Sequence, residues 1–315
     1  MMTLHLALKP SRVISPSRIW LGATRFNVQG CKGFGTTHIQ RSGKIPFQHT
    51  ELSTKARKLV ESKISLDGKV TVITGGSRGI GLELAKTAAA LGSDIAILDV
   101  REPDESIAQL QEAYGSRFVF HQMDVTSMDG MEAAFDKVVQ KLGKINNCVT
   151  CAGIALDKPF LEHTWDESRR ILDINILGSF FSAQLAARQM IKQGDGGSIV
   201  MIASIAAHCA IPAQRVSIYG ASKGAIKLLG KTLAVEMAPF NVRVNTISPG
   251  FIETKMSAQF EDIQEVFRSV PPMRRIGQAE DLALATAYLL GNGASYTTGA
   301  DIAVTGGLHN GRIEL

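Results

Sequence analysis

Residues 74–81 read Thr-Gly-Gly-Ser-Arg-Gly-Ile-Gly and stand between a short β-branched run, 70–74, and a helical stretch, 82–91. Glycines permit a tight turn and let the backbone approach a pyrophosphate, and the helix that follows offers free N–H groups and a favourable dipole. An acid ends the next predicted strand, 95–99. A strand, this glycine pattern, a helix and an acid in that order predict a dinucleotide site. The residues expected to hold the dinucleotide here are Gly75, Ser77, Arg78, Gly79, Ile80, Gly81 and Asp99.

Strand-like and helical stretches alternate from this site to the end of the chain. Further strands are predicted at 118–123, 145–150, 198–203, 242–247 and 301–304. Helices are predicted near 105–113, 128–142, 165–192, 217–237, 253–268 and 279–290. Alternation at this spacing implies a parallel sheet with helices on both faces. The predicted fold class is therefore α/β: a doubly wound Rossmann-type fold with a seven-stranded parallel sheet, in one domain over residues 67–315.

The first fifty residues differ in composition from the rest of the 315-residue chain. They contain seven of the 34 basic residues and no Asp or Glu, which leaves 27 basic against all 29 acidic residues in 51–315. A basic, hydroxyl-rich, acid-free leader is typical of a mitochondrial presequence, so we expect a mitochondrial protein. The alternative is an unstructured extension on a cytoplasmic protein. Residues 51–66 resemble a polar arm with helical character.

This distribution of charge also bears on partners. The basic pI of about 9.0 comes from the leader, and the body shows no basic cluster of the kind that nucleic-acid binding needs. No run reaches 18 uninterrupted apolar residues, so we expect no membrane span. Cys148 and Cys151 form a C-x-x-C inside an apolar strand-like run, without a second ligand pair. We interpret them as buried structural thiols and predict no metal site.

Four residues further along the chain form a candidate catalytic group. Tyr219 and Lys223 are four residues apart on a predicted helix, which places both on one face. A tyrosine proton donor has an ordinary pKa near 10, and a neighbouring ammonium would lower that pKa. Ser204 closes the predicted strand 198–203, where its hydroxyl could polarise a substrate oxygen. Asn175 lies inside the long predicted helix, where Asn is intrinsically poor, and a side chain or backbone kink there could hold a water.

The choice between the two nicotinamide cofactors depends on charge. Asp99 can accept hydrogen bonds from the adenosine ribose and would repel a 2′-phosphate, which favours NAD(H). Arg78 and Arg101 could each bind that phosphate, so NADP(H) is the alternative. Asp124 and Val125 end the third strand and could hold the adenine edge, although Asp124 could instead be a turn or helix-capping acid.

The order of these motifs resembles the short-chain dehydrogenase/reductase family, over about residues 67–309. The resemblance implies that Tyr219 is the general acid/base and that Lys223 lowers its pKa and binds the nicotinamide ribose. It implies that Ser204 orients the substrate oxygen and that Asn175 supports a water relay. Pro249 to Thr254 resembles the segment that contacts nicotinamide, with the Ile252 backbone and the Thr254 hydroxyl on the carboxamide. By the same resemblance the backbone at Ala152 and Gly153 approaches the cofactor.

The expected activity is an NAD(P)-dependent oxidoreductase acting on a secondary alcohol or ketone. The family usually has Asn-Asn-Ala-Gly where this chain has Thr-Cys-Ala-Gly at 150–153, a variant similar to some polyol and ketose members. The substrate is left open between a polyol/ketose pair and a more hydrophobic ketone. A catalytically silent, cofactor-binding scaffold is the alternative function. The family resemblance implies a homodimer or homotetramer. The expected pocket walls are mostly apolar: Ile154, Leu156, Ile205, His208, Phe251, Met256 and Phe260.

Overall fold

The structure is a computed structural model that describes residues 54–258 and 263–311. The leader, residues 1–50, lies outside the described residues, and so does Phe260. A helix, α1 (Thr54–Ile64), precedes the first strand and occupies most of the predicted polar arm. Leu59 and Val60 on this helix are exposed.

The centre of the fold is a seven-stranded sheet in which every neighbouring pair is parallel. The strand order is β3-β2-β1-β4-β5-β6-β7. The first three strands therefore extend the sheet to one side of β1, and β4 returns to pair with the other side of β1, from which the remaining strands extend the sheet in the opposite direction. In such folds ligands bind in the crevice at the carboxyl ends of the strands, at this reversal. The strands are β1 (Val70–Thr74), β2 (Asp94–Asp99), β3 (Phe118–Gln122), β4 (Asn147–Thr150), β5 (Gly197–Ile202), β6 (Val242–Pro249) and β7 (Asp301–Val304).

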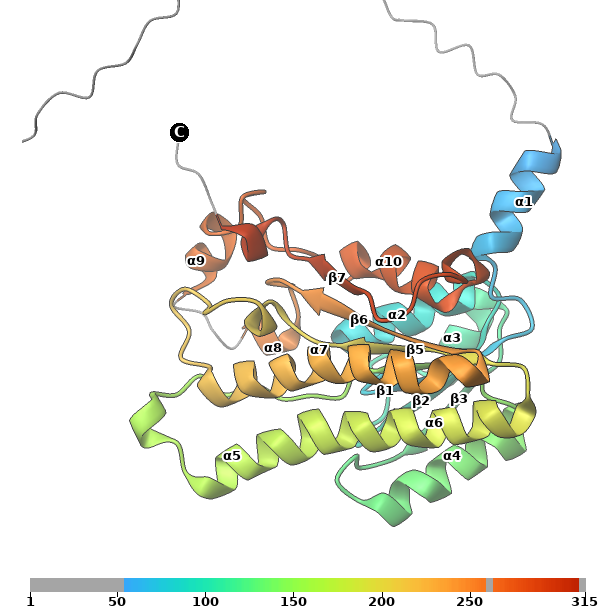
Figure 1. Cartoon of the computed structure of the whole chain (residues 1–315), viewed down its shortest axis with the longest axis horizontal. Coiled ribbons are helices and arrows are strands. Elements are labelled where there is room, and N and C mark those ends of the chain that lie inside the picture. The colour runs from blue at the N-terminus through green and yellow to red at the C-terminus, as the bar shows by residue number, and fades with distance from the viewer. Residues whose placement is uncertain (1–53, 259–262, 312–315) are drawn as a thin grey trace, which may run out of the picture. The chain divides into compact units, whose positions relative to one another are not determined.

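Helices cover both faces of this sheet (Figure 1). One layer holds α4 (Met128–Leu142), α5 (Trp165–Leu172), α6 (Ser179–Gln193) and α7 (Ser217–Met237). The opposite layer holds α2 (Gly79–Ala90), α3 (Ile107–Tyr114) and α10 (Glu280–Leu290). Two short helices, α8 (Lys255–Ala258) and α9 (Gln264–Ser269), follow β6. The predicted fold class is confirmed.

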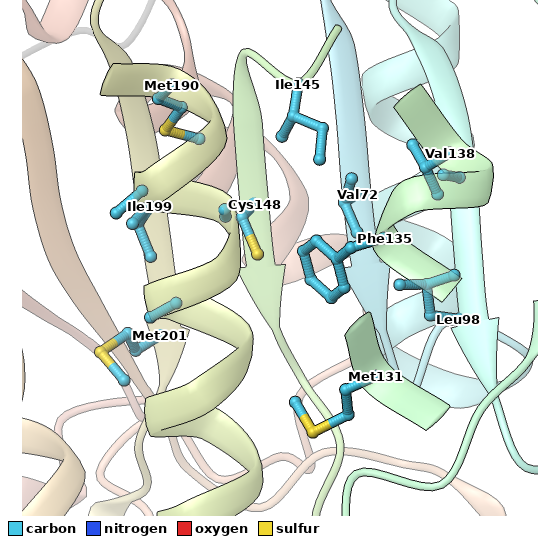
Figure 2. Packing of buried hydrophobic residues seen from close by; sticks show 14 of the residues in the cluster. Val72, Leu98, Met131, Phe135, Val138, Ile145, Cys148, Met190, Ile199 and Met201 are labelled. Carbon is cyan, nitrogen blue, oxygen red and sulfur yellow. The ribbon is translucent and has the colours of Figure 1, made fainter. Parts of the chain in front are cut away.

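Alternation along the strands divides the core into two clusters. Val72 and Cys148 face α4 and α6, whereas Ile73 and Val149 face α2 and α10. Figure 2 shows the first cluster, in which Phe135 of α4 lies beside Val72 of β1 and Met190 of α6 lies near Ile199 of β5. Strands buried on both faces are expected to be almost wholly apolar, which explains why they read as short β-branched runs.

Two predicted helices are divided in the structure. The stretch 165–192 is α5, then a π-helical turn over Asp173–Gly178, then α6. The stretch 253–268 contains α8 and α9, with 259–262 outside the described residues. The apolar periodicity of a helix is nearly the same on both sides of a one-turn π bulge, so periodicity alone could not reveal it. Within 54–258 and 263–311, no helix is both long enough and apolar enough to span a bilayer.

Candidate active site

The crevice begins where the glycine-rich turn meets the segment after β4. Gly75 has a φ of +69°, and a Cβ there would lie 2.6 Å from the backbone nitrogen of Ala152. The Cys151 N–H donates to the Thr74 carbonyl at 3.0 Å, which extends the β1–β4 pairing past the strand ends. Only glycine permits both this φ and this approach. Backbone contacts therefore hold the Thr-Cys-Ala-Gly segment in place without the amide side chain that Cys151 replaces.

The first turn of α2 is built to receive an anion. A Cβ on Gly81 would collide with the Gly75 carbonyl, so the turn folds tightly onto the helix. Arg78 is the N-cap residue of α2 and makes no side-chain capping hydrogen bond, whereas Ser106, Ser127 and Thr164 each cap their own helices. The N–H groups of this first turn are thus left for a ligand, and the helix dipole adds to the attraction for a pyrophosphate.

Asp99 lies at the end of β2 beside this turn. Its Oδ2 accepts the Ser77 N–H at 3.1 Å, and its Oδ1 accepts the Arg101 N–H at 3.3 Å. The Ser77 hydroxyl donates to the Arg101 carbonyl at 2.6 Å, which ties the two loops together. Each carboxylate oxygen has a further lone pair for a ribose hydroxyl.

A cavity of about 310 Å³ joins these elements. Its lining unites most of the predicted dinucleotide-binding residues, but Ser77, Tyr219, Lys223 and Ile252 are not part of the wall. Sequence reasoning missed Arg170 on α5 and Lys255 on α8. Lys255 directly follows Thr254, and a cation at that position was the available signal. The predicted residues that line the cavity are Gly75, Arg78, Gly79, Ile80, Gly81, Asp99, Asp124, Val125, Ala152, Gly153 and Thr254.

Asp124 has a local structural role as well as a place on the cavity wall. Its Oδ1 accepts the Thr126 N–H at 2.9 Å and the Thr126 hydroxyl at 2.8 Å. The residue that caps α4 is Ser127. Asp124 is therefore a turn acid and not a helix cap. Val125 is buried and packs where a Cβ on Gly178 would stand.

The segment after β6 folds over the glycine-rich turn. Ile252 forms a parallel bridge with Gly277 through the Phe251 carbonyl and the Glu253 N–H, each at 2.8 Å. Because alternate residues of an extended chain point in opposite directions, the backbone groups of Ile252 itself point away from Gly277. The Thr254 Oγ1 accepts the Ser257 N–H at 3.2 Å, and the Thr254 methyl lies 3.5 Å from where a Cβ on Gly79 would stand.

Asn175 lies in the π-helical turn and is fully buried. Its Oδ1 accepts the Ile154 N–H at 2.9 Å, and its Nδ2 donates to the Ile154 carbonyl at 3.0 Å. The Nδ2 also donates to the Ser222 hydroxyl at 3.0 Å, a partner on α7 that sequence reasoning missed. The side chain thus clamps the segment after β4 with both of its N–H donors engaged, which leaves the backbone of the turn and the second lone pair of Oδ1 as places for a water.

Ser204, Tyr219 and Lys223 come together next to Gly153. A Cβ on Gly153 would lie 3.5 Å from Lys223 Nζ and 3.3 Å from Asn175 Oδ1. Lys223 Nζ lies 5.8 Å from the centre of the Tyr219 ring and donates to the Ile202 carbonyl at 2.8 Å. The Ser204 Oγ accepts the Ala206 N–H at 3.1 Å, and the Ser204 side chain also hydrogen-bonds to Tyr219.

Burial dominates the proton affinities of this group. It raises the pKa of Tyr219 above its ordinary value, and the hydrogen bond from Ser204 opposes the rise. It lowers the pKa of Lys223 to about 8, with the Cys151 thiol acting in the other direction. In the structure the Ser204 side chain acts to lower the pKa of Tyr219. That the Lys223 ammonium, 5.8 Å from the centre of the ring, also lowers this pKa stays a prediction.

The cysteines near the site are thiols. Burial raises the pKa of Cys148 to about 12 and that of Cys151 to about 11. Thiols with such pKa values are almost wholly protonated near neutrality and make poor nucleophiles or metal ligands. Across the described ranges 54–258 and 263–311, no cluster of His, Cys, Asp and Glu has the composition of a metal site.

Apolar side chains surround Tyr219 on its outer side. The Phe251 and Phe267 rings stack at 4.1 Å in this cluster. His208 does not join it: its Nε2 lies 2.9 Å from Asp301 Oδ2, and burial lowers its pKa. His208 is thus tied to β7, and it also lines a second cavity of about 610 Å³ together with Ser217 and Gly220 of α7. The buried members of the cluster are Ile205, Ile211, Val216, Phe251, Phe267, Ile276 and Leu308.

Comparisons with known proteins agree with this geometry. Residues 75–309 match a family model described as enoyl-(acyl carrier protein) reductase. The chain is 36% identical to the sorbose reductase of Schizosaccharomyces pombe over 251 residues, 78% of this chain and 98% of that protein. It is 36% identical to a probable NADP-dependent mannitol dehydrogenase of Yarrowia lipolytica over 261 residues, 80% of this chain and 92% of that protein.

A solved structure shows the same fold. The short-chain type dehydrogenase/reductase of Mycobacterium marinum superimposes with a TM-score of 0.76 at 35% identity, over 79% of this chain and 98% of that one. The region that matches the family model, residues 75–309, contains β2 to β7 and both groups of residues in the crevice. The chain belongs to the short-chain dehydrogenase/reductase family.

Proposed function

We propose that this protein is an NAD(P)-dependent oxidoreductase that interconverts a secondary alcohol and a ketone, with Tyr219 as its general acid/base. The observation that carries the proposal is the meeting of Ser204, Tyr219 and Lys223 beside Gly153, a residue that lines the cavity of about 310 Å³. The residues fit a nicotinamide dinucleotide, since Gly75 and Gly81 let the turn pack tightly against the backbone of Ala152 and of the turn itself, both glycines line the cavity, and α2 begins without a side-chain cap. When bound, that cofactor supplies or accepts the hydride.

Asn175, Ser204, Tyr219 and Lys223 then provide the proton transfer and hold the reacting groups in place. In the reductive direction the Tyr219 hydroxyl donates its proton to the developing alkoxide, and in the oxidative direction the phenolate accepts the alcohol proton. The Ser204 oxygen already accepts the Ala206 N–H, so its own proton is directed to Tyr219 or to the substrate oxygen. A positioned donor of this kind stabilises the charge that develops on the oxygen.

Lys223 and Asn175 support this proton transfer from the inner side. Lys223 donates one hydrogen bond to the Ile202 carbonyl and has two further N–H donors for the nicotinamide ribose. Asn175 holds the backbone of Ile154, so it fixes the segment that the resemblance places against the cofactor. We assign the water of the relay to the backbone of the π-helical turn, since both N–H donors of Asn175 are already engaged.

We propose a preference for NAD(H) over NADP(H), because the Asp99 carboxylate stands at the adenosine end of the cavity and would repel a 2′-phosphate. Three relatives bear NADP in their names, the mannitol dehydrogenases of Yarrowia lipolytica and Hypocrea jecorina and the (R)-specific alcohol dehydrogenase of Lentilactobacillus kefiri, and these names favour NADP(H) instead. The preference is therefore a prediction about this chain and depends on Asp99. A comparison of kcat/KM for the two cofactors on the wild-type protein tests it directly.

For the substrate we propose a ketone flanked by apolar groups. A cluster of buried apolar side chains packs against Tyr219 and would offer a polyol no hydrogen-bond partners. The neighbouring cavity of about 610 Å³ also has polar lining residues, among them Lys158, His208 and Gln214. The polyol/ketose class is the second candidate, favoured by the names of two relatives and by the Cys-Ala-Gly variant at 151–153. A turnover panel of aliphatic and aromatic ketones against ketoses, and of the matching alcohols, separates the two.

The same panel separates the enzyme from a catalytically silent scaffold. A scaffold would bind the nucleotide and turn over none of the panel. The described catalytic group makes us favour the enzyme, since Ser204, Tyr219 and Lys223 are all present and in mutual contact through Tyr219.

We also propose a homo-oligomer and mitochondrial import. Leu228 and Val235 on α7 are 65% and 77% exposed, which supports a helix face that pairs between subunits. Light scattering on the purified chain would give the mass of the oligomer.

The composition of residues 1–50 supports mitochondrial import, and a fluorescent fusion of those residues tests it. A diffuse cytosolic signal would overturn the import proposal without affecting the enzyme assignment.

A further inference from the structure

Four cations line the cavity, and three of them, Arg78, Arg101 and Lys255, lie close enough to the loop after β2 to act on its acids. Arginines and lysines in this position are what a 2′-phosphate site requires. Asp99 opposes such a site. Because one carboxylate faces three cations, Asp99 alone would determine the preference for NAD(H) over NADP(H) only weakly. The structure brings a second acid, Asp104, to the same place.

Asp104 lies in the loop between β2 and α3. Its N–H donates to the Ser77 carbonyl at 2.9 Å, which fixes the loop to the glycine-rich turn. Its Oδ2 accepts the Lys255 ammonium at 2.8 Å, although the two residues are 151 positions apart in the sequence. The side chain of Asp104 is 33% exposed and that of Lys255 is 66% exposed, so this ion pair lies at the rim of the cavity.

Charges on all three cations act on this acid. The hydrogen bond from Lys255 contributes most to holding the pKa of Asp104 below its ordinary value, and Arg101 and Arg78 contribute in the same direction. Asp104 is therefore ionised at neutral pH and already partners Lys255. A 2′-phosphate arriving here would have to displace Asp104 from Lys255 and would then stand near two carboxylates, Asp99 and Asp104.

We propose that Asp104 determines cofactor specificity together with Asp99: it holds Lys255 and so withholds that cation from a 2′-phosphate. The inference rests on the proposed cofactor cavity and deepens it by naming a residue outside the glycine-rich motif. Asp104 acts through Lys255 and is a positioning residue, not a catalytic one.

The test measures binding of two nucleotide fragments by calorimetry, without any turnover. Adenosine 2′,5′-bisphosphate carries the 2′-phosphate, and adenosine 5′-monophosphate does not. In the Asp104→Asn variant we expect affinity for the bisphosphate to rise at least about 10-fold, the value of one added charge-assisted contact, while affinity for the monophosphate changes less than about two-fold. The ratio of the two affinities is independent of the fraction of protein that is folded.

Three further variants make the result specific. Asp104→Glu keeps the charge and should keep the wild-type ratio. Glu102→Gln removes an exposed acid from the same loop and should also leave the ratio unchanged. Adding Lys255→Met to Asp104→Asn should abolish most of the gain, because the released cation is then absent.

An unchanged ratio in Asp104→Asn would overturn the proposal, and so would an equal gain in Glu102→Gln, which would point to general surface charge. Persistence of the gain in the double variant would overturn the role of Lys255. A wild-type protein that binds neither fragment would overturn the cofactor cavity itself and the proposal with it, whereas monophosphate binding with an unchanged ratio would leave the proposed oxidoreductase intact.

Discussion

Lys223 holds its ammonium 5.8 Å from the centre of the Tyr219 ring while donating to the Ile202 carbonyl at 2.8 Å. The cation is thus fixed one helical turn from the phenol and anchored to the end of β5. Burying an ammonium is costly, and the lowered pKa of Lys223, about 8, measures that cost. A residue that destabilises the fold and yet contacts the reactive phenol is typical of a functional site.

The first prediction follows from this cost. Lys223→Met should stabilise the protein at pH 7, by at most on the order of 3 kcal/mol, when unfolding is measured without added nucleotide. Below about pH 8 Lys223 is protonated in both the folded and the unfolded chain, so the cost of burying its ammonium is fully present. As the pH rises from about 8 towards 10.5 the folded chain releases its proton first, and the difference should shrink. Urea unfolding at pH 7 and pH 10 checks this.

Lys231→Met is the matched control for that experiment, since Lys231 is exposed on the same helix. It should change the unfolding free energy little at either pH. A stabilisation by Lys223→Met that is equal at pH 7 and pH 10 would show that packing, and not the buried charge, is responsible.

A second prediction concerns the close approach at the glycine-rich turn. Gly75 and Gly115 have almost the same φ, +69° and +67°, but a Cβ on Gly75 would meet the Ala152 backbone and a Cβ on Gly115 would meet nothing within 4 Å. Gly115→Ala should cost only the strain of the left-handed backbone, about 1–2 kcal/mol. Gly75→Ala should cost at least about 2 kcal/mol more and should abolish nucleotide binding. Equal costs would contradict the contact between the turn and the segment after β4.

A third prediction uses two buried threonines on the adjacent strands β1 and β4. Among the described residues, the buried Thr150 Oγ1 has no hydrogen-bond partner, whereas the buried Thr71 Oγ1 contacts Ser93 Oγ at 2.8 Å and accepts from Asn147 Nδ2 at 3.3 Å. Thr150→Val keeps the shape and removes the unpaired hydroxyl, so it should stabilise the protein by about 1 kcal/mol. Thr71→Val should destabilise it by about as much. Thermal unfolding of both variants decides the sign, and a loss in Thr150→Val would mean that its hydroxyl is paired.

A fourth prediction concerns Asp99. Asp99→Asn removes the charge and keeps one acceptor oxygen for the loop, so the Ser77 and Arg101 contacts should be partly retained. We expect the ratio of kcat/KM for NADP(H) to that for NAD(H) to rise at least about 10-fold, since one repulsion disappears and a ribose hydrogen bond worth roughly 1.5–3 kcal/mol is weakened. Steady-state kinetics with both cofactors measures it. A wild-type enzyme with a clear NADP(H) preference would contradict the assignment of Asp99 before any variant is made.

Much of the fold was predictable because local pattern and topology agree in this chain. The strand ends were accurate where apolar runs stop at glycine or a charged residue, as at 70–74 and 301–304, and α4 and α7 match their predicted limits. The π-helical turn at Asp173–Gly178 was not predicted, because its apolar residues continue the helical period on both sides.

The site was predictable to the extent that motifs determine it. The glycine-rich turn, Asp99 and the Tyr219–Lys223 spacing each have a local chemical reason. The role of Ser222 depends on Asn175, 47 residues away, and that of Asp104 depends on Lys255, 151 residues away. No local sequence pattern predicts such pairs. The pKa of Tyr219 likewise depends on burial by the apolar cluster and on Ser204, neither of which spacing can reveal.

The central claim is that Tyr219 exchanges the proton with the substrate oxygen, and Tyr219→Phe tests it most directly. The variant keeps the ring against the apolar cluster and removes only the hydroxyl that Ser204 hydrogen-bonds. We predict that single-turnover reduction of the best ketone falls at least about 100-fold, within or above the range of general acid–base catalysis, while the dissociation constant of the cofactor changes less than about three-fold. Turnover at the wild-type rate, with the hydride-transfer step shown to be rate-limiting by a deuterium isotope effect, would contradict the account.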